Sequence, residues 1–338
     1  MLFRLKMSVE DAITAYTSVA KTVFTEKKLP HQEGTFKATL LESAIVKIIG
    51  KSQTKHVDEK EARAMQMLNK EGPKWYPQNV FYLQSDSDCC VSFVCAMSAH
   101  NMAFPTRFRS WIPLKNASYN CTIVEAARAT SAAPTFFKGI AIGDENLKEI
   151  YVDGGLRLNN PVKYVISEAE SAFPNCRISC LLSLGTGVPE VIGLEKPDSF
   201  QKMVPSKLIN VLKGIATDCE AASEDVARDF QDKGTYFRLN VDAGLENITL
   251  AEWTSLPAVS AHTIAYLHKE EVDSKVDRLL AILDERLAEL WVPYSLPTTP
   301  FMMRNPRPSP DFLFGVQLAH FVRSYRVVSL SEPTMSPP

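Results

Sequence analysis

The residues best suited to chemistry lie in YVDGGLRLNNPV at 151–162, where Asp153 is followed by Gly154 and Gly155. An aspartate fixed at the end of a strand can act as a general base, and glycines let a nucleophile or substrate approach it closely. The same tripeptide also forms ordinary turns, because glycine tolerates positive φ and aspartate can bond nearby backbone amides. The tripeptide alone leaves both interpretations open.

The elements around this turn follow from local patterns. EIYVD predicts a short strand that enters the turn, and Asn160-Pro161 is typical of a helix start, with the asparagine as N-cap. Three further helices have a predicted start signal: Ser8 is the N-cap of a helix at 8–24, Thr39 and Glu42 form a capping box for a helix at 40–49, and Thr122 and Glu125 form a second capping box for the helix that starts there. Helical periodicity alone predicts helices at 206–232, 262–269 and 270–291. Strand-like runs occupy 79–85, 91–99, 107–112, 178–187 and 236–241. This alternation predicts an α/β sandwich with a largely parallel sheet.

Composition limits the class of protein. The chain has 338 residues, 45% hydrophobic and 22% charged, which is typical of a folded globular protein. A net charge of −2 predicts no nucleic-acid partner. No apolar run reaches the ~18 residues of a membrane span, and Arg4 and Lys6 break the N-terminal apolar run that a signal peptide would need. Seven cysteines, an odd number, favour reduced thiols and a cytoplasmic location.

The sequence favours neither a metal nor a cofactor. Cys89, Cys90 and Cys95 do not form a CxxC pair, and His262 and His268 do not form HExxH. The GTG at 185–187 lacks the further glycine of a dinucleotide loop and the lysine of a P-loop, so a turn after a strand is the better interpretation. We therefore expect no cofactor.

Three segments together resemble a known family. AARATSAAPTFF (126–137), VDGGLRLNNPV (152–162) and LLSLGTG (181–187) resemble, in this order, the second half of a patatin-like phospholipase domain. FVCAMSAHN (93–101) and the predicted helix at 8–24 resemble fungal members. The resemblance implies a three-layer α/β/α sandwich and a lipid acyl hydrolase acting on phospholipid or glycerolipid esters, with a lipid substrate and peripheral contact with membranes. It covers roughly residues 5–290. We predict a domain at 1–292 and a proline-rich irregular tail at 293–338.

The family's chemistry uses a serine in GxSxG as nucleophile, an aspartate that takes its proton, and a glycine-rich loop for the oxyanion. The resemblance carries the aspartate onto Asp153, with Gly154 and Gly155 completing its motif. In this sequence the single pair of glycines four residues apart, Gly139 and Gly143, has Ala141 at its centre. No GxSxG serine is present, and we expect the domain to be N-terminally incomplete.

Two other serines could be considered as substitutes for the nucleophile. Ser131 ends a predicted helix and Ser183 lies within a predicted strand, so neither has the strand-turn-helix setting that exposes a nucleophile. Three hypotheses remain for the chain. It is an enzyme-family member that is inactive as it stands, a noncatalytic pseudoenzyme that binds lipid or protein, or a fragment that does not fold stably alone. The intact DGG motif favours the first.

Overall fold

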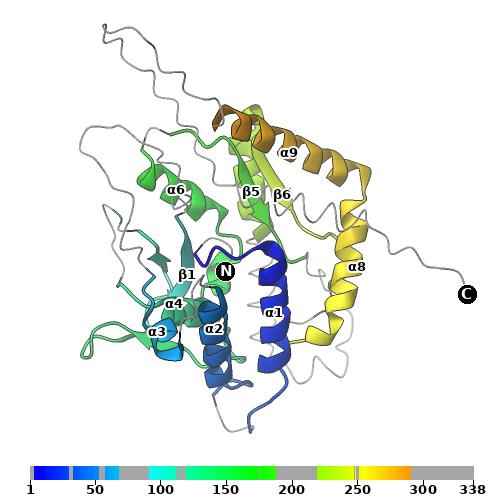
Figure 1. Cartoon of the computed structure of the whole chain (residues 1–338). Coiled ribbons are helices and arrows are strands. Elements are labelled where there is room, and N and C mark those ends of the chain that lie inside the picture. Colours follow the sequence, from blue (N-terminus) through cyan, green and yellow to red (C-terminus); the bar gives the residue numbers. More distant parts are fainter. Residues whose placement is uncertain are drawn as a thin grey trace, which may run out of the picture.

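The computed structural model confirms the α/β class (Figure 1). It describes residues 4–29, 33–52, 58–67, 91–111, 113, 119–174, 176–187, 219–246, 248 and 251–290, with no side-chain description for 232 and 286–290. The strand predicted at 79–85, residues 206–218 of the predicted long helix, and the predicted tail at 293–338 lie outside these ranges.

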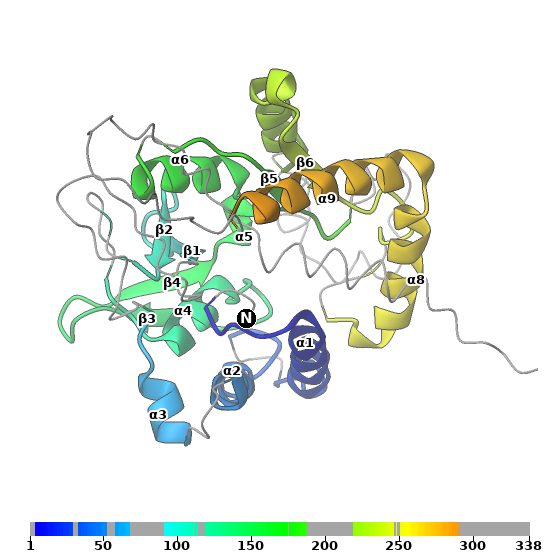
Figure 2. The ribbon, with the colours of Figure 1, turned by 45° about the horizontal axis from the view of Figure 1, so that its top comes forward.

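Two long helices begin the described chain. They are α1, Val9–Val23, and α2, Ala38–Ser52, which pack against each other and are seen close together in Figure 2. The Ser8 hydroxyl accepts the Asp11 N–H at 3.1 Å, which confirms Ser8 as N-cap of α1. Both helices contribute to one buried apolar cluster with Phe36 and Phe137. A short helix, α3, Glu59–Ala64, follows α2.

A four-stranded sheet forms the centre of the first half. Its strands are β1 Phe93–Ser98, β2 Pro105–Arg109, β3 Ile140–Ile142 and β4 Glu149–Asp153, in the order β2-β1-β4-β3. Helix α4, Ile123–Thr130, packs against it and buries Ala126 and Ala129 with Phe108 and Tyr151 of the sheet.

The largely parallel sheet that the sequence predicted is wrong for these four strands, since every pairing among them is antiparallel. The reason is local. The connections at 99–104 and 143–148 are too short for a crossover helix, and short loops join antiparallel neighbours. The predicted strands at 91–99 and 107–112 had no helix between them, which is the signal of a hairpin.

A second, two-stranded sheet does have the predicted parallel pairing. Its strands are β5 Leu181–Leu184 and β6 Tyr236–Leu239, with Ser183 opposite Arg238. Its helices are α6 Val162–Ala172, residues 219–229, α8 Leu256–Leu267 and α9 Glu270–Leu290. Leu181 packs with α6 and Val226, whereas Phe237 packs with α8 and α9. Helices therefore cover both faces of this pair.

The predicted helix starts have different outcomes. The Thr122–Glu125 capping box is present at the start of α4. The box at Thr39 and Glu42 is wrong, because α2 already begins at Ala38 and the Glu42 carboxylate accepts from Arg63 at 2.6 Å instead. Helix α6 begins at Val162 with Pro161 at its N-cap position, so the prediction of Asn160 as N-cap is wrong by one residue, although the Asn160 side chain accepts the N–H of Val162 at 3.3 Å.

Candidate active site

Asp153 is the last residue of β4 and lies between two fixed segments. It pairs with Ala96 of β1, and its N–H donates to the Ala132 carbonyl at 3.1 Å, just beyond α4. Helix α5, Gly155–Leu158, starts two residues later and packs against β1. The backbone of the candidate base is therefore held by β1 on one side and by the end of α4 on another.

The carboxylate of Asp153 has few partners. Its Oδ1 accepts the N–H of Gly155 at 2.7 Å, which closes a local turn of the kind that aspartate favours. Within the described ranges no other group donates to this carboxylate. One oxygen is thus engaged by the turn, and the other is left for a donor that the described residues do not supply.

Burial controls the acidity of this group. Desolvation raises the pKa of Asp153, and the bond from Gly155 opposes the rise without cancelling it. Desolvation also raises the pKa of the Cys95 thiol on β1 to about 11. A carboxylate whose pKa is raised is a stronger base, which is the direction that general-base chemistry needs.

The two glycines of the motif differ in what they do. A Cβ on Gly154 would lie 2.4 Å from the Cys95 carbonyl oxygen and 2.8 Å from its carbon, so this residue must be glycine for α5 to pack on β1. A Cβ on Gly155 would lie 3.1 Å from the Asp153 Oδ1. The first glycine has a packing reason, and the second keeps space beside the carboxylate.

The other residues considered from sequence do not join Asp153. Ser131 is the C-cap of α4, and Ser183 lies in β5, where its hydroxyl donates to Asn160 at 3.2 Å and accepts from Arg238 at 2.9 Å. Ala141, at the centre of the spaced glycine pair, is an exposed residue of β3 and not a strand-to-helix turn. In the described part of the chain, no serine hydroxyl donates to Asp153.

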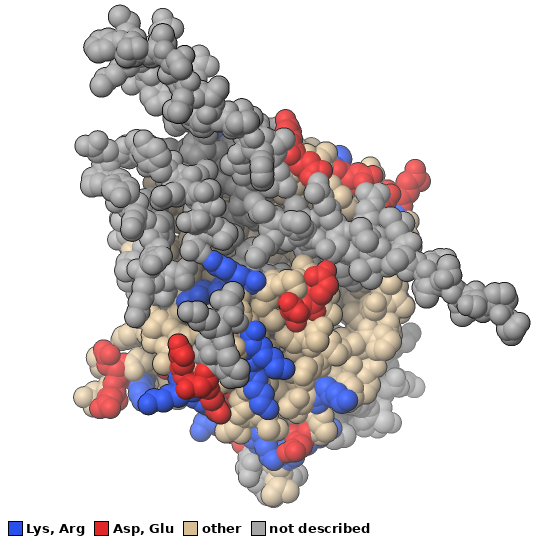
Figure 3. All heavy atoms as spheres, viewed as in Figure 1, with Lys and Arg blue, Asp and Glu red and all other residues tan. Residues whose placement is uncertain are grey.

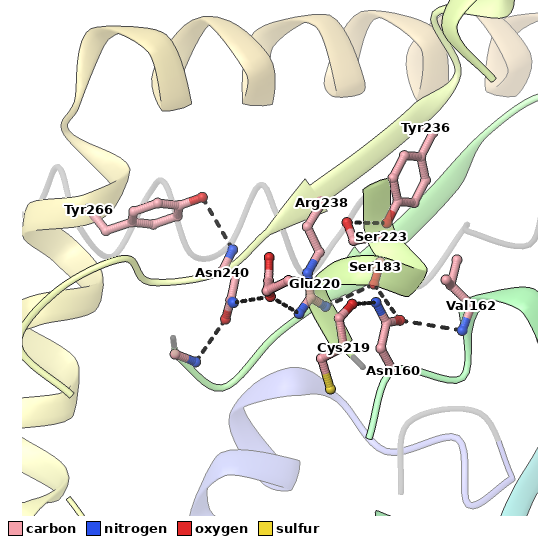
Figure 4. A network of polar contacts seen from close by, with 11 residues as sticks. Asn160, Val162, Ser183, Cys219, Glu220, Ser223, Tyr236, Arg238, Asn240 and Tyr266 are labelled. Atoms are coloured by element: carbon pink, nitrogen blue, oxygen red, sulfur yellow. Dashed lines mark hydrogen bonds and ion pairs between the residues drawn. The ribbon is translucent and has the colours of Figure 1, made fainter. Parts of the chain in front are cut away.

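Sequence reasoning missed the role of Asn160, which it interpreted only as a helix cap. Asn160 is buried, and besides accepting the Val162 N–H it donates to the Cys219 carbonyl at 3.1 Å and accepts from Ser183. One side chain thereby ties the start of α6 to β5 and to the helix at 219–229, as Figure 4 shows. The paired asparagines in the sequence gave no signal of this long-range role.

The glycine turn after β5 is filled by the protein's own polar side chains. The Asn240 Oδ1 accepts the Gly187 N–H at 2.8 Å, and Asn240 and Arg238 both contact the Glu220 carboxylate (Figure 4). A Cβ on Gly185 would lie 2.1 Å from the Asn240 Oδ1. These contacts agree with the interpretation of 185–187 as a turn.

The described residues offer neither a metal centre nor a membrane span. They contain no group of three or more His, Cys, Asp or Glu side chains placed to hold a metal ion. Among these residues, no helix has both the length and the apolarity needed to cross a bilayer.

Comparison with known proteins places the candidate site in a matched region. Residues 5–166 match the family model of patatin-like phospholipases. The chain is 32% identical over 168 residues to the calcium-independent phospholipase A2-gamma of Rattus norvegicus, covering 49% of this chain and 20% of the relative. It is 31% identical over 168 residues to the protein of that name from Homo sapiens, again covering 49% and 20%.

A plant protein matches over a shorter stretch. Phospholipase A I of Arabidopsis thaliana is 35% identical over 63 residues, which is 19% of this chain and 4% of the relative. The chain thus spans about a fifth of the length of the mammalian relatives that it matches. Asp153, Gly154 and Gly155 all lie within the region that matches the family model.

Proposed function

We propose, from the patatin-like phospholipase character of residues 5–166, that this chain derives from a lipid acyl hydrolase and that Asp153 occupies the position of its general base. The observation that carries the proposal is the state of the Asp153 carboxylate. Its pKa is raised by burial, and a single described N–H donates to it. Phospholipid or glycerolipid esters are the proposed substrates.

In the proposed reaction the free oxygen of Asp153 accepts the proton of a serine hydroxyl as the serine oxygen attacks the ester carbonyl. With no histidine between them, the carboxylate must lie within hydrogen-bond reach of that hydroxyl. The rigid position of Asp153 at the end of β4 would supply this placement. The sequence contains no GxSxG serine, so the 338-residue chain alone is expected to hydrolyse esters no faster than background.

A two-part experiment tests this proposal. The chain is first treated with a fluorophosphonate probe, and stoichiometric labelling would contradict the expected lack of a nucleophile. The chain is then joined behind a family-type segment with a glycine-rich loop and a GxSxG serine. Ester hydrolysis should appear, and Asp153→Asn should lower it by about 10²–10⁴-fold, because the amide keeps the shape but cannot take a proton. Equal activity with asparagine would refute the assignment of Asp153.

A noncatalytic binding module is the second candidate, and one contact favours it. Gly154 is required by its approach to the Cys95 carbonyl, so the glycine would persist without any catalytic demand. Under this alternative the joined protein folds and binds lipid but hydrolyses no ester. The partly buried carboxylate with a raised pKa favours the hydrolase, since a turn alone has no need of it.

A further inference from the structure

Two hairpin loops lie at the same end of the strands of the four-stranded sheet. Ser98 of β1 pairs with Tyr151 of β4, and the Ala99 N–H donates to the Ile150 carbonyl at 2.8 Å, so the end of β1 lies beside the beginning of β4. The β1–β2 loop at 99–104 and the β3–β4 loop at 143–148 therefore emerge side by side. With a strand spacing of nearly 5 Å, the centres of the two hairpins are about 10 Å apart.

Both loops present apolar side chains to solvent. Phe104 is 77% exposed and Met102 41% in the first loop, and Leu147 is 67% exposed in the second. Ile150, two residues after the second loop ends, is 43% exposed. These are four of the nine large apolar side chains that are exposed in the described part of the chain, and they gather at one edge of one sheet.

The first loop is also joined to the candidate active site. The Arg157 guanidinium of α5 donates to the Met102 carbonyl at 3.1 Å, and α5 starts directly after Asp153 and Gly154. This bond joins the first loop to the helix that follows the candidate base, while Asp153 itself lies at the other end of β4 from the two loops.

The charges near the loops indicate what kind of surface they fit. Asp144, Glu145 and Lys148 lie in the second loop, and acidic and basic side chains stand together at the lower left of Figure 3, where this loop lies in Figure 1. Two carboxylates beside Lys148 and Arg157 form no cationic cluster that would attract an anionic membrane, whereas zwitterionic headgroups carry no net charge. Separate apolar side chains on two loops also lack the flat, continuous face of about 1,000 Å² or more that a stable dimer needs.

We propose that the hairpin loops at 99–104 and 143–148 dock this protein on a zwitterionic phospholipid surface, with Phe104 and Leu147 inserted among the lipids. The inference rests on the proposed function, because it names the surface through which an acyl hydrolase would reach its substrate. Transfer of apolar surface from water into lipid provides the driving force, and the acidic residues remain in the headgroup layer.

Vesicle binding of the full 338-residue chain tests the inference. We expect it to bind large phosphatidylcholine vesicles in co-sedimentation, with little change on adding phosphatidylserine or on raising the salt concentration. The double variant Phe104→Ser, Leu147→Ser should lower the partition coefficient at least about tenfold, since each insertion buries a large side chain. Leu29→Ser is the matched control, because Leu29 is 72% exposed but lies after α1.

The outcomes separate the alternatives. Unchanged binding by the double variant, no binding by the parent chain, or binding that requires phosphatidylserine and is lost in salt would each overturn the inference. If ultracentrifugation shows a dimer that the double variant abolishes, the loops bind a second copy and the lipid assignment is wrong.

Asp153→Asn should bind vesicles as the parent chain does. A joined protein that binds through the loops but shows no Asp153-dependent hydrolysis would refute the proposed function alone.

Discussion

Asp153 and Glu168 are two carboxylates on opposite sides of strand β1, and they differ in the groups that donate hydrogen bonds to them. Glu168 of α6 accepts two bonds of 2.6 Å from Arg109 and lies 3.0 Å from the guanidinium of Arg107, both on β2. Asp153 ends β4, on the other side of β1, and one N–H from its own turn donates to it within the described ranges. Among the described residues, the buried Glu168 has two cationic partners, and the partly buried Asp153 has none.

This difference separates a structural charge from a candidate functional one. Bidentate pairing with Arg109 compensates the desolvation of Glu168 and joins α6 to the four-stranded sheet. Within the described part of the chain, the Asp153 side chain bonds only to the Gly155 N–H of its own turn, and no cation compensates its desolvation. Uncompensated buried charges cost stability, and they are concentrated at functional sites.

Removing the carboxylate of Glu168 should have the largest effect on stability. Glu168→Ala leaves two guanidinium groups without their acid, and Arg109 is almost fully buried. Breaking a buried pair in this way costs about 3–5 kcal/mol in the free energy of unfolding. Urea denaturation followed by circular dichroism measures it, and Glu168→Gln keeps the shape if the alanine variant does not fold.

Lys163→Ala is the matched control for this experiment. Lys163 lies on the same helix and pairs with Asp225, and both side chains are largely exposed to solvent. Exposed pairs contribute little, so the midpoint should hardly move. If Glu168→Ala behaves like Lys163→Ala, the buried cluster is not structural and the comparison with Asp153 fails.

The glycines after Asp153 offer a second test, with an intermediate effect. Both lie in or beside α5, and neither has a positive φ. Gly154→Ala places a methyl group against the Cys95 carbonyl and should destabilise the protein by about 1–3 kcal/mol through overpacking. For Gly155→Ala the three nearest atoms to the new methyl group all belong to side chains, those of Asp153 and Asn159, so this variant should cost less. Equal midpoints in thermal unfolding would show that α5 can move away from β1.

Local patterns in the sequence predicted much of the fold around the site. The strand before Asp153, the helix after Asn160 and the capping box at Thr122 depend on neighbouring residues, and all three are present. The pairing of strands depends instead on loop length and on distant partners, and the antiparallel sheet was not predicted.

At the candidate site, too, local sequence patterns do not predict contacts with distant residues. The sequence identified Asp153 as the candidate base, and its role stays a prediction. The packing reason for Gly154 could not be predicted, because the Cys95 carbonyl that excludes a side chain at this position lies 59 positions earlier in the chain. The contacts of Asn160 with Ser183 and Cys219 likewise join segments that no local pattern connects.

Asp153→Asn should have the smallest effect on stability, and the effect should depend on pH. Because the folded state raises the pKa of Asp153, the folded protein binds more protons than the unfolded chain between the two pKa values. The contribution of Asp153 to stability is therefore fully present below the pKa of a free aspartate, about 3.9, and is lost as pH rises through the folded pKa. An asparagine carries no charge and does not suffer this loss.

At pH 7 the asparagine variant should match or exceed the parent chain in stability, by on the order of 1 kcal/mol or less, since its amide oxygen can still accept the Gly155 N–H. As the pH falls towards 4 the advantage should shrink, because the carboxyl of the folded parent protein becomes protonated. Thermal midpoints of the two proteins across this range measure the difference. A variant that is much less stable at pH 7 would mean that the charged carboxylate has a stabilising partner, and Asp153 would then resemble Glu168 instead of contrasting with it.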